Sequence, residues 1–256
     1  MVPKALTIAG SDPTGGAGLQ LDLQVFAAHG VHGMAVPTAL TVQSTARVQR
    51  VLPAFPHVVA EQLTFLLADV RPDVIKIGML GTDDIVLRVS YALERQALPR
   101  IVDPVLQASD GTLLLERRAW GNLLERIVSG AALVTPNRLE AQALTGHTDP
   151  ERAAAELLEV GAQAVLIKGG HAEGPPDDFL CNAEGGEWIR AERTSASGAH
   201  GTGCALSAAI AARLALGDAL PDAVRGAKRY VEDALANAFA AGSGQKLLRV
   251  SRPPRA

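Results

Sequence analysis

A glycine-rich turn and a cysteine stand together in the stretch AHGTGCAL, just before a long run of helix-forming residues. Gly201 and Gly203 flank Thr202, so the backbone N–H groups of residues 201–204 are predicted to converge at a helix N-terminus. The helix dipole adds about half a positive charge there. Such a cradle would stabilise a phosphoryl group in transfer, or favour the thiolate of Cys204. The alternative is a buried cysteine that packs as a small hydrophobic side chain.

A second glycine-rich stretch, GSDPTGGAG at residues 10–18, also precedes a helix-like run. Glycine lets the backbone approach an anion closely because it has no Cβ atom. A tight turn that only caps a helix would have the same composition. The sequence has neither a P-loop nor a dinucleotide-binding G-x-G-x-x-G in the right context, so a nucleotide would be bound in another way.

The composition argues against several other classes of protein. With 48% hydrophobic and 20% charged residues, the chain is expected to form one globular α/β domain over residues 1–256. A net charge of -3 without a dense Lys/Arg cluster predicts no nucleic-acid partner. No apolar run is long enough for a signal peptide or a membrane span, so we expect a cytoplasmic protein without a membrane partner. Cys181 and Cys204 are too few for a disulfide framework and lack zinc-site spacing.

The elements that must position these residues follow from an alternation of β-rich and amphipathic helical runs. This alternation predicts an α/β fold with a mostly parallel central sheet and helices on both faces. A small β-hairpin is expected around Gly185–Gly186, followed by helices at roughly 203–217 and 221–241. The β-rich runs are residues 5–9, 74–78, 100–105, 132–136 and 164–170.

Ligands of such a sheet bind beyond the carboxyl ends of the strands, so the loops that follow the strands are the candidate site. Those loops are residues 10–18, 76–80, 103–111, 135–141 and 168–171. We therefore expect one site built from segments far apart in the sequence.

Seven blocks of the sequence resemble, in order, those of the hydroxymethylpyrimidine/phosphomethylpyrimidine kinases of thiamine biosynthesis, and the resemblance covers nearly the whole chain. The blocks are ALTIAGSDPTGGAG, PTALTVQST, KIGML, VDPV, TPNRLEA, VLIKGGH and HGTGCALSAAIAA. These kinases belong to the ribokinase-like superfamily, which includes the vitamin B6 kinases.

The resemblance implies a ribokinase-like fold, a homodimer and the use of ATP with Mg²⁺. The implied reaction phosphorylates 4-amino-5-hydroxymethyl-2-methylpyrimidine, and then its monophosphate, to the diphosphate. Two alternatives remain open: a pyridoxal/pyridoxine kinase, and a catalytically weak pyrimidine-binding sensor that acts on a partner protein.

For the pyrimidine, the resemblance implies contacts with Gly10, Asp22, Gln43 and Met79. Asp22 and Gln43 would hydrogen-bond the ring nitrogens and the amino group, while Gly10 and Met79 would shape a pocket for a flat ring. Without the resemblance, Asp22 would be interpreted as a solvated carboxylate on a surface helix and Gln43 as a loop amide.

For the nucleotide, the resemblance places Asn137 and Glu140 near the phosphates and the water shell of Mg²⁺, with Asp103 in the same acidic corner. Mg²⁺ prefers oxygen ligands and keeps several waters, which suits scattered carboxylates. Lys168 would neutralise phosphate charge, and Thr202 would also contact the nucleotide. Without the resemblance, Lys168 would be a solvent-exposed lysine and the two acids would be capping or surface residues.

For catalysis, we expect Gly201, Thr202 and Gly203 to present backbone donors to the transferring phosphoryl group, with the thiolate of Cys204 accepting the proton of the substrate hydroxyl. A free thiol has a pKa of about 8.5, so this role requires the helix and nearby cations to lower the pKa of Cys204. His171 and His200 are expected to shape their loops, because phosphoryl transfer needs positioning and electrostatics more than a strong base.

The chain departs from the family's pattern around the nucleotide. The segment LQASDG follows DPV, with Ser109 where lysine is common, and no cysteine is present there of the kind found in some B6 kinases. Ala199 replaces a usual threonine, and GSGQKLLRV replaces a Gly-x-Gly-Pro ending. These changes bear on nucleotide affinity and on closure of the lid.

Overall fold

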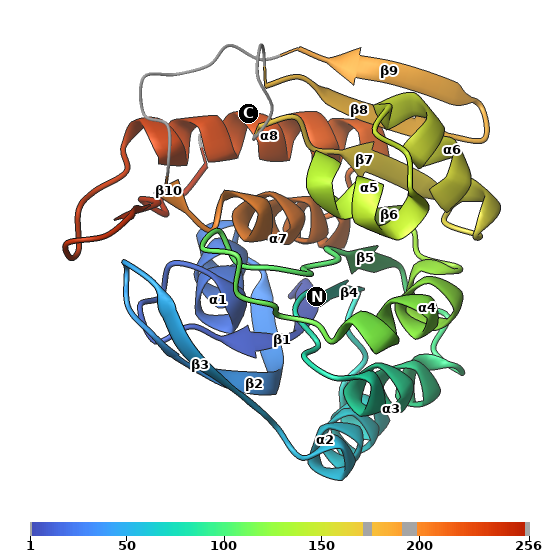
Figure 1. Cartoon of the computed structure of the whole chain (residues 1–256), viewed down its shortest axis with the longest axis horizontal. Helices are drawn as coiled ribbons and strands as arrows, with labels where there is room; N and C mark the ends of the chain where they lie inside the picture. Colours follow the sequence, from blue (N-terminus) through green and yellow to red (C-terminus); the bar gives the residue numbers. More distant parts are fainter. Residues whose placement is uncertain (1, 171–175, 191–198, 254–256) are drawn as a thin grey trace.

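Nine strands form one sheet in the computed structural model, which describes residues 2–170, 176–190 and 199–253 (Figure 1). Their order is β3-β2-β1-β4-β5-β6-β7-β8-β9. Neighbours from β2 to β7 pair in parallel, whereas β3, β8 and β9 pair antiparallel, so the predicted mostly parallel sheet is confirmed. The strands are β1 (Lys4–Ser11), β2 (His32–Gln43), β3 (Val48–Pro53), β4 (Val74–Ile77), β5 (Arg100–Val102), β6 (Leu133–Val134), β7 (Ala164–Ile167), β8 (Asp178–Asn182) and β9 (Gly185–Ile189).

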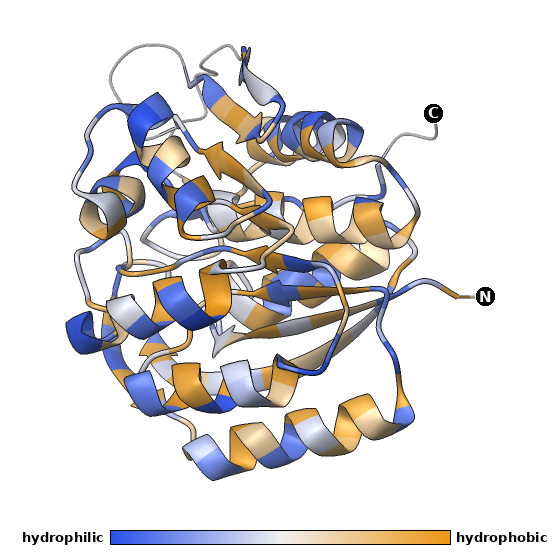
Figure 2. Ribbon diagram, turned by 90° about the vertical axis from the view of Figure 1, so that its right-hand side faces the viewer, coloured by the Kyte–Doolittle hydropathy of each residue, from blue (hydrophilic) through white to orange (hydrophobic). Residues whose placement is uncertain are grey.

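Helices cover both faces of the sheet, as predicted, and Figure 2 shows the strands between them. Helices α1, α7 and α8 pack on one face, and α2 to α6 pack on the other. The helices are α1 (Gly18–Ala28), α2 (Pro56–Asp69), α3 (Asp83–Leu93), α4 (Trp120–Asn122), α5 (Arg138–Thr145), α6 (Pro150–Glu159), α7 (Thr202–Ala215) and α8 (Leu220–Ala236). Within the described residues, none of the helices has the length and apolar character needed to span a bilayer.

The buried strands supply side chains to two hydrophobic cores, one on each face of the sheet. Leu6 and Ile8 of β1 belong to the core beneath α2 to α6, whereas Ala5 belongs to the core beneath α1, α7 and α8. This division follows from the period of two along a strand, which sends successive side chains to opposite faces. Because these strands are buried on both faces, their sequences are mostly apolar, and this made them recognisable.

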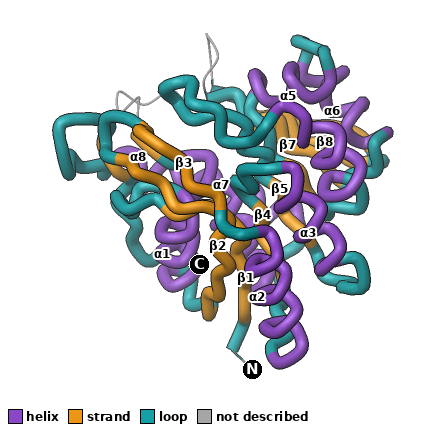
Figure 3. The backbone as a smooth tube through the Cα atoms, turned by 60° about the horizontal axis from the view of Figure 1, so that its bottom comes forward, coloured by secondary structure: helices purple, strands orange, loops and turns teal. Residues whose placement is uncertain are grey.

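The sequence analysis did not identify β2, β3 or α2. Pro37 lies inside β2 and cannot donate a ladder hydrogen bond, and the register with β1 shifts between Ala9 and Gly10. These irregularities hide the period of two. Figure 3 shows β2 and β3 together at one edge of the molecule and β7 and β8 at the other.

The predicted hairpin is present as β8 and β9, but its turn lies two residues earlier than expected. Asn182 pairs with Gly185, so Ala183 and Glu184 form the turn and the two glycines begin β9. A Cβ atom on Gly186 would lie 2.4 Å from the Phe179 ring, so this glycine is required by packing rather than by the turn. The two predicted C-terminal helices are confirmed, with α8 ending at Ala236.

Helix α7 lies between α1 and α8, and its N-terminus faces the carboxyl ends of the parallel strands (Figure 1). The short strand β10 (Ala199–His200) leads directly into it and pairs with β11 (Lys246–Leu247). The chain therefore brings a tail segment, a helix N-terminus and the strand ends to one place.

Candidate active site

A cavity of about 1120 Å³ lies where the sequence predicted a site, beyond the carboxyl ends of the parallel strands. One part of its wall comes from β1, the end of β2 and the loop after β4. Another part comes from the segments after β5, β6 and β7, and the N-terminus of α7 joins the two parts. Predicted site residues in the wall are Gly10, Gln43, Met79, Asp103, Asn137, Glu140, Lys168, Gly201, Thr202, Gly203 and Cys204.

The turn before α7 has the geometry of the predicted cradle. Gly201 has a φ of 82°, and a Cβ atom there would lie 1.9 Å from the carbonyl oxygen of Gly16, so only glycine fits. No side chain caps this helix, and the first intrahelical bond runs from the Ala205 N–H to the Gly201 carbonyl at 2.9 Å. The N–H groups of residues 202–204 thus precede the helical ladder, at a point that lines the cavity.

The second glycine of the turn brings α7 against a buried lysine. A Cβ atom on Gly203 would lie 3.0 Å from Lys168 Nζ and 3.9 Å from Asp103 Oδ2. The helix N-terminus and the ammonium group therefore create positive potential at the same part of the cavity. An anion bound there would face both.

Lys168 links the two acids that the resemblance placed near Mg²⁺. Its ammonium lies 2.7 Å from Asp103 Oδ1 and 4.0 Å from Glu140 Oε2. Burial alone would lower the pKa of Lys168, but the two carboxylates raise it, so the lysine stays charged. Burial would likewise raise the pKa of Asp103, but Lys168 and Lys76 hold it below its ordinary value. Lys168 is therefore not the solvent-exposed lysine of the alternative interpretation.

Asn137 and Glu140 form a capping box at the start of α5. The Asn137 side chain accepts the Glu140 N–H at 2.9 Å, and Glu140 Oε2 accepts the Asn137 N–H at 2.7 Å. Burial raises the pKa of Glu140 to about 7, with Lys168 acting in the opposite direction. Both residues thus combine the capping role with a position in the cavity wall.

Cys204 lies in the cavity wall, but its ionisation differs from the prediction. Burial raises the pKa of the thiol to about 11, even though the positive charge of Lys76 opposes this. The expectation of a lowered pKa is therefore wrong for this structure, because removal of the thiolate from water outweighs the attraction of Lys76. The thiol is protonated at neutral pH.

Asp22 does not line the cavity. Its carboxylate is fully buried, 2.9 Å from Lys76 Nζ, and it accepts a hydrogen bond of 2.6 Å from the Thr7 hydroxyl. The predicted contact between Asp22 and the pyrimidine therefore does not fit this geometry, and neither does a solvated surface carboxylate. Its neighbour Lys76, which the sequence analysis missed, is the one that lines the cavity.

The other three residues assigned to the pyrimidine do lie together at the cavity. A Cβ atom on Gly10 would lie 2.7 Å from Met79 Sδ, so the thioether packs directly on the glycine. Met79 is held by a 2.6 Å hydrogen bond from the Thr38 hydroxyl to its carbonyl. Gln43 ends β2 at the cavity edge rather than standing in a loop.

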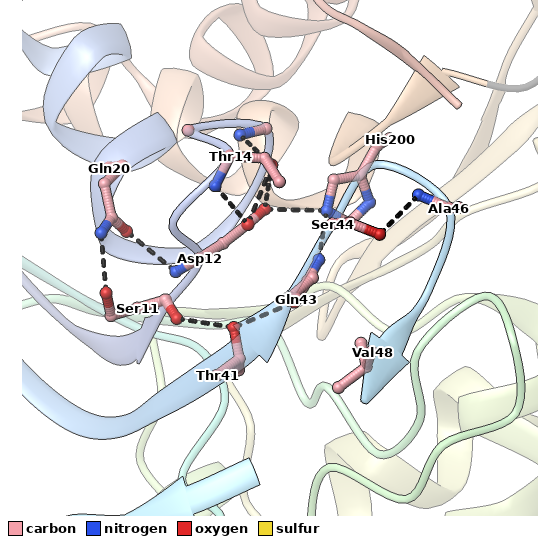
Figure 4. A network of polar contacts seen from close by, with 12 residues as sticks. Ser11, Asp12, Thr14, Gln20, Thr41, Gln43, Ser44, Ala46, Val48 and His200 are labelled. Carbon is pink, nitrogen blue, oxygen red and sulfur yellow. Dashed lines mark hydrogen bonds and ion pairs between the residues drawn. The ribbon is translucent and has the colours of Figure 1, made fainter. Parts of the chain in front are cut away.

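A polar network joins Gln43 to the glycine-rich loop (Figure 4). His200 Nε2 lies 2.9 Å from Asp12 Oδ2 and 3.0 Å from the Gln43 amide. Asp12 also accepts the Thr14 N–H at 2.9 Å. The network joins three segments that are distant in sequence, so His200 contacts other segments as well as shaping its own loop. His171 lies outside the described residues.

The cavity continues toward α8, a region that the sequence analysis did not assign. Lys228 Nζ lies 2.5 Å from Asp178 Oδ2, and both residues line the cavity. Ser109, at the altered position after DPV, also lines it. Apolar residues Val231 and Leu235 add a surface suited to a flat ring. Among the described residues, no group of three or more His, Cys, Asp or Glu side chains is placed to hold a metal by itself.

Comparison with known proteins gives consistent matches. The sequence model of the family described as phosphomethylpyrimidine kinase matches residues 12–249. Hydroxymethylpyrimidine/phosphomethylpyrimidine kinases from Synechococcus elongatus and Escherichia coli are 42% and 43% identical to this chain. The first alignment covers 95% of each chain, and the second covers 91% of each.

Solved structures are similar over almost the whole chain. A phosphomethylpyrimidine kinase from Clostridium difficile has a TM-score of 0.82 at 35% identity, covering 91% of this chain and 99% of that one. A pyridoxal kinase from Staphylococcus aureus in complex with ADP has a TM-score of 0.90 at 31% identity, covering 98% and 94%.

Proposed function

Since the chain belongs to the phosphomethylpyrimidine kinase family, we propose that it transfers the γ-phosphoryl group of ATP to 4-amino-5-hydroxymethyl-2-methylpyrimidine. The first transfer gives the monophosphate and ADP, and a second transfer to that phosphate gives the diphosphate. The observation that carries the proposal is one cavity with Gly10, Gln43 and Met79 on one side and Lys168 on the other, joined by the N-terminus of α7. This arrangement would suit an alcohol and a phosphate donor on either side of an anion cradle.

The cradle and Lys168 perform the main electrostatic task. During transfer, negative charge spreads over the oxygens of the γ-phosphoryl group, and fixed N–H donors stabilise it without reorganisation. Lys168 uses one N–H toward Asp103, at 2.7 Å, which leaves further donors for a phosphate oxygen. Asp103 therefore fixes the lysine where Gly203 approaches it.

Cys204 is proposed to accept the proton of the substrate hydroxyl. The oxygen forms the new P–O bond as the bond to ADP breaks, and the hydroxyl proton passes to the sulfur. The acceptor must be the thiolate, and burial makes that form scarce at neutral pH because the pKa is about 11. Turnover through this base should therefore increase with pH.

The nucleotide is proposed to bind with Mg²⁺ between Asp103 and Glu140. Both residues would offer carboxylate oxygens as ligands. Part of their hydrogen-bonding capacity is already used by Lys168, Asn137 and Ser207. This set fits an ion that keeps most of its waters and takes other ligands from the phosphates. When bound, Mg²⁺ would neutralise phosphate charge; Asp103 and Glu140 would orient its water shell.

A pyridoxal kinase is the second candidate. The observation in its favour is the TM-score of 0.90 with the Staphylococcus aureus pyridoxal kinase, against 0.82 for the Clostridium difficile enzyme. The curated relatives, at 42% and 43% identity, favour the aminopyrimidine. Specificity rests on the few groups that touch the ring, so overall shape does not decide it.

The test compares ADP release with each alcohol at saturating ATP and Mg²⁺. The proposal predicts a higher kcat/KM for the aminopyrimidine alcohol than for pyridoxal. A higher value for pyridoxal would favour the second candidate. Binding without ADP release would indicate a sensor.

We also propose that the chain forms a homodimer through the β2–β3 edge. Four exposed side chains form an apolar strip there: Leu40, Val42, Leu52 and Phe55. A second copy would cover this strip and protect the edge strand β3 from other pairing. Sedimentation equilibrium should give a mass of twice 26.6 kDa for the wild type, and the double variant Leu40→Glu/Leu52→Lys should shift it toward one chain.

A further inference from the structure

The ring nitrogen Nε2 of His200 faces two partners at once. It lies 2.9 Å from Asp12 Oδ2 and 3.0 Å from Gln43 Nε2 (Figure 4). Burial would raise the pKa of Asp12, but hydrogen bonds from His200 and Thr14 hold it below its ordinary value, so Asp12 is ionised and only accepts. Nε2 must therefore carry a hydrogen, and the Gln43 atom beside it must be an acceptor as well.

Thr41 is compatible with the same orientation of Gln43 from the other side. Its hydroxyl lies 3.0 Å from the Ser11 carbonyl oxygen and 3.1 Å from Gln43 Oε1, and it can donate to either. With the amide turned, the hydroxyl donates to the Ser11 carbonyl and accepts an N–H from Gln43, so Thr41 remains satisfied.

We propose that His200 is a positioning residue that fixes the Gln43 amide with its carbonyl oxygen toward the imidazole and its NH₂ toward Thr41. In this arrangement the single hydrogen on Nε2 is shared between the Asp12 carboxylate and the Gln43 carbonyl oxygen, and one amide N–H of Gln43 donates to Thr41. A half-turn of the amide exchanges its oxygen and nitrogen without moving the rest of the side chain, so the choice depends on these neighbours alone. In the opposite orientation the Gln43 NH₂ group faces the Nε2–H of His200, donor against donor.

The fixed amide determines which ring the cavity accepts; this step rests on the proposed function. Gln43 lines the cavity, with one N–H and one lone pair left for a ligand. An aminopyrimidine offers a ring-nitrogen acceptor beside an amino donor, which matches such a pair. The 3-hydroxypyridine ring of pyridoxal offers neighbouring oxygens instead. An amide free to rotate would adapt to either ring, whereas a fixed one discriminates.

The tautomer of His200 tests the assignment directly. Long-range ¹H–¹⁵N correlation spectra of the labelled full chain, assigned with His200→Gln, should show a protonated Nε2. An unprotonated Nε2 at pH 8 would overturn the proposal. This measurement needs no substrate, so it is independent of the proposed function.

The kinetic test uses two substitutions that differ in where they place an N–H donor. The amide nitrogen of His200→Gln lies near the position of Nε2, whereas that of His200→Asn lies near Nδ1. His200→Asn should raise the KM for the aminopyrimidine about five- to tenfold and reduce its preference over pyridoxal by a similar factor, with the KM for ATP unchanged. His200→Gln should restore most of both values. His32→Gln, at the exposed opposite end of β2, is the matched control.

A double-mutant cycle separates positioning from a general structural effect. In a Gln43→Ala background, His200→Asn should cause no further change in the aminopyrimidine KM, because its effect passes through the amide. Additive effects, or an unchanged substrate preference in His200→Asn, would overturn the proposal. Absence of aminopyrimidine turnover by the wild-type chain would instead refute the proposed function, and the tautomer would still test the assignment.

Discussion

Turnover should rise steeply with pH if the Cys204 thiolate is the base. With a pKa of about 11, about one thiol in 10⁴ is ionised at pH 7 and about one in 10³ at pH 8. Each pH unit therefore multiplies the thiolate population by about ten until the pH approaches the pKa. At saturating substrates, log kcat should increase with a slope near 1 between pH 7 and pH 9.

The assay is direct quantification of ADP and phosphorylated product, which avoids pH effects on coupling enzymes. Cys204→Asp should retain part of the activity and lose the slope, because a carboxylate at this position would ionise at a lower pH. Cys204→Ala should reduce kcat strongly with little change in the Kd for the pyrimidine. Cys181→Ala is the matched control: its thiol also has a pKa raised to about 11 by burial, but it lies on β8 away from the cavity wall, so the slope should remain.

Two results would refute this reasoning. One is a flat kcat for the wild type over the same pH range. The other is near wild-type turnover in Cys204→Ala, which would assign catalysis to the backbone cradle and Lys168, and leave the cysteine a packing role.

Three further predictions concern other parts of the site. The carboxylate of Glu140, with a pKa raised to about 7, forms as the pH rises through that value, so the KM for Mg-ATP should fall between pH 6 and 8. Glu140→Gln should abolish this fall in KM, and a fall that persists in the variant would rule out Glu140 as its cause. Gly201→Ala should lower kcat by about 100-fold through loss of the cradle, whereas Gly217→Ala, also at positive φ but with nothing within 4 Å, should stay active; equal activities would contradict the cradle. Asp22→Asn should lower the free energy of unfolding in urea by about 3–5 kcal/mol because it leaves a buried ammonium unpaired, and an unchanged midpoint would argue against the ion pair.

The sequence predicted those parts of the fold whose signal is local. The buried strands β1, β4 and β7 appear as short β-rich runs, and the cradle appears as Gly-Thr-Gly before a helix. β2 escaped notice because Pro37 and a register shift break its pattern. Local patterns thus located most loops of the site but not β2, whose last residue, Gln43, completes the cavity wall.

The roles of Asp22 and Cys204 depended on information that the sequence does not carry locally. Asp22 of α1 is buried against Lys76 of β4, 54 positions away in the sequence, and nothing in either segment signals the pair. The pKa of Cys204 depends on how much water the folded chain excludes, and this effect outweighs the charge of Lys76. His200 gained its role because Asp12 and Gln43, from two other segments, meet at its ring.

The most direct test of the central claim is the identity of the product. The purified chain is incubated with ATP, Mg²⁺ and 4-amino-5-hydroxymethyl-2-methylpyrimidine, and the reaction is followed by ³¹P NMR with mass spectrometry. We predict a monophosphate ester that appears first and a pyrophosphate ester that replaces it, with ADP formed at each step. Absence of any phosphorylated pyrimidine, together with rapid conversion of pyridoxal to its 5′-phosphate, would contradict the account.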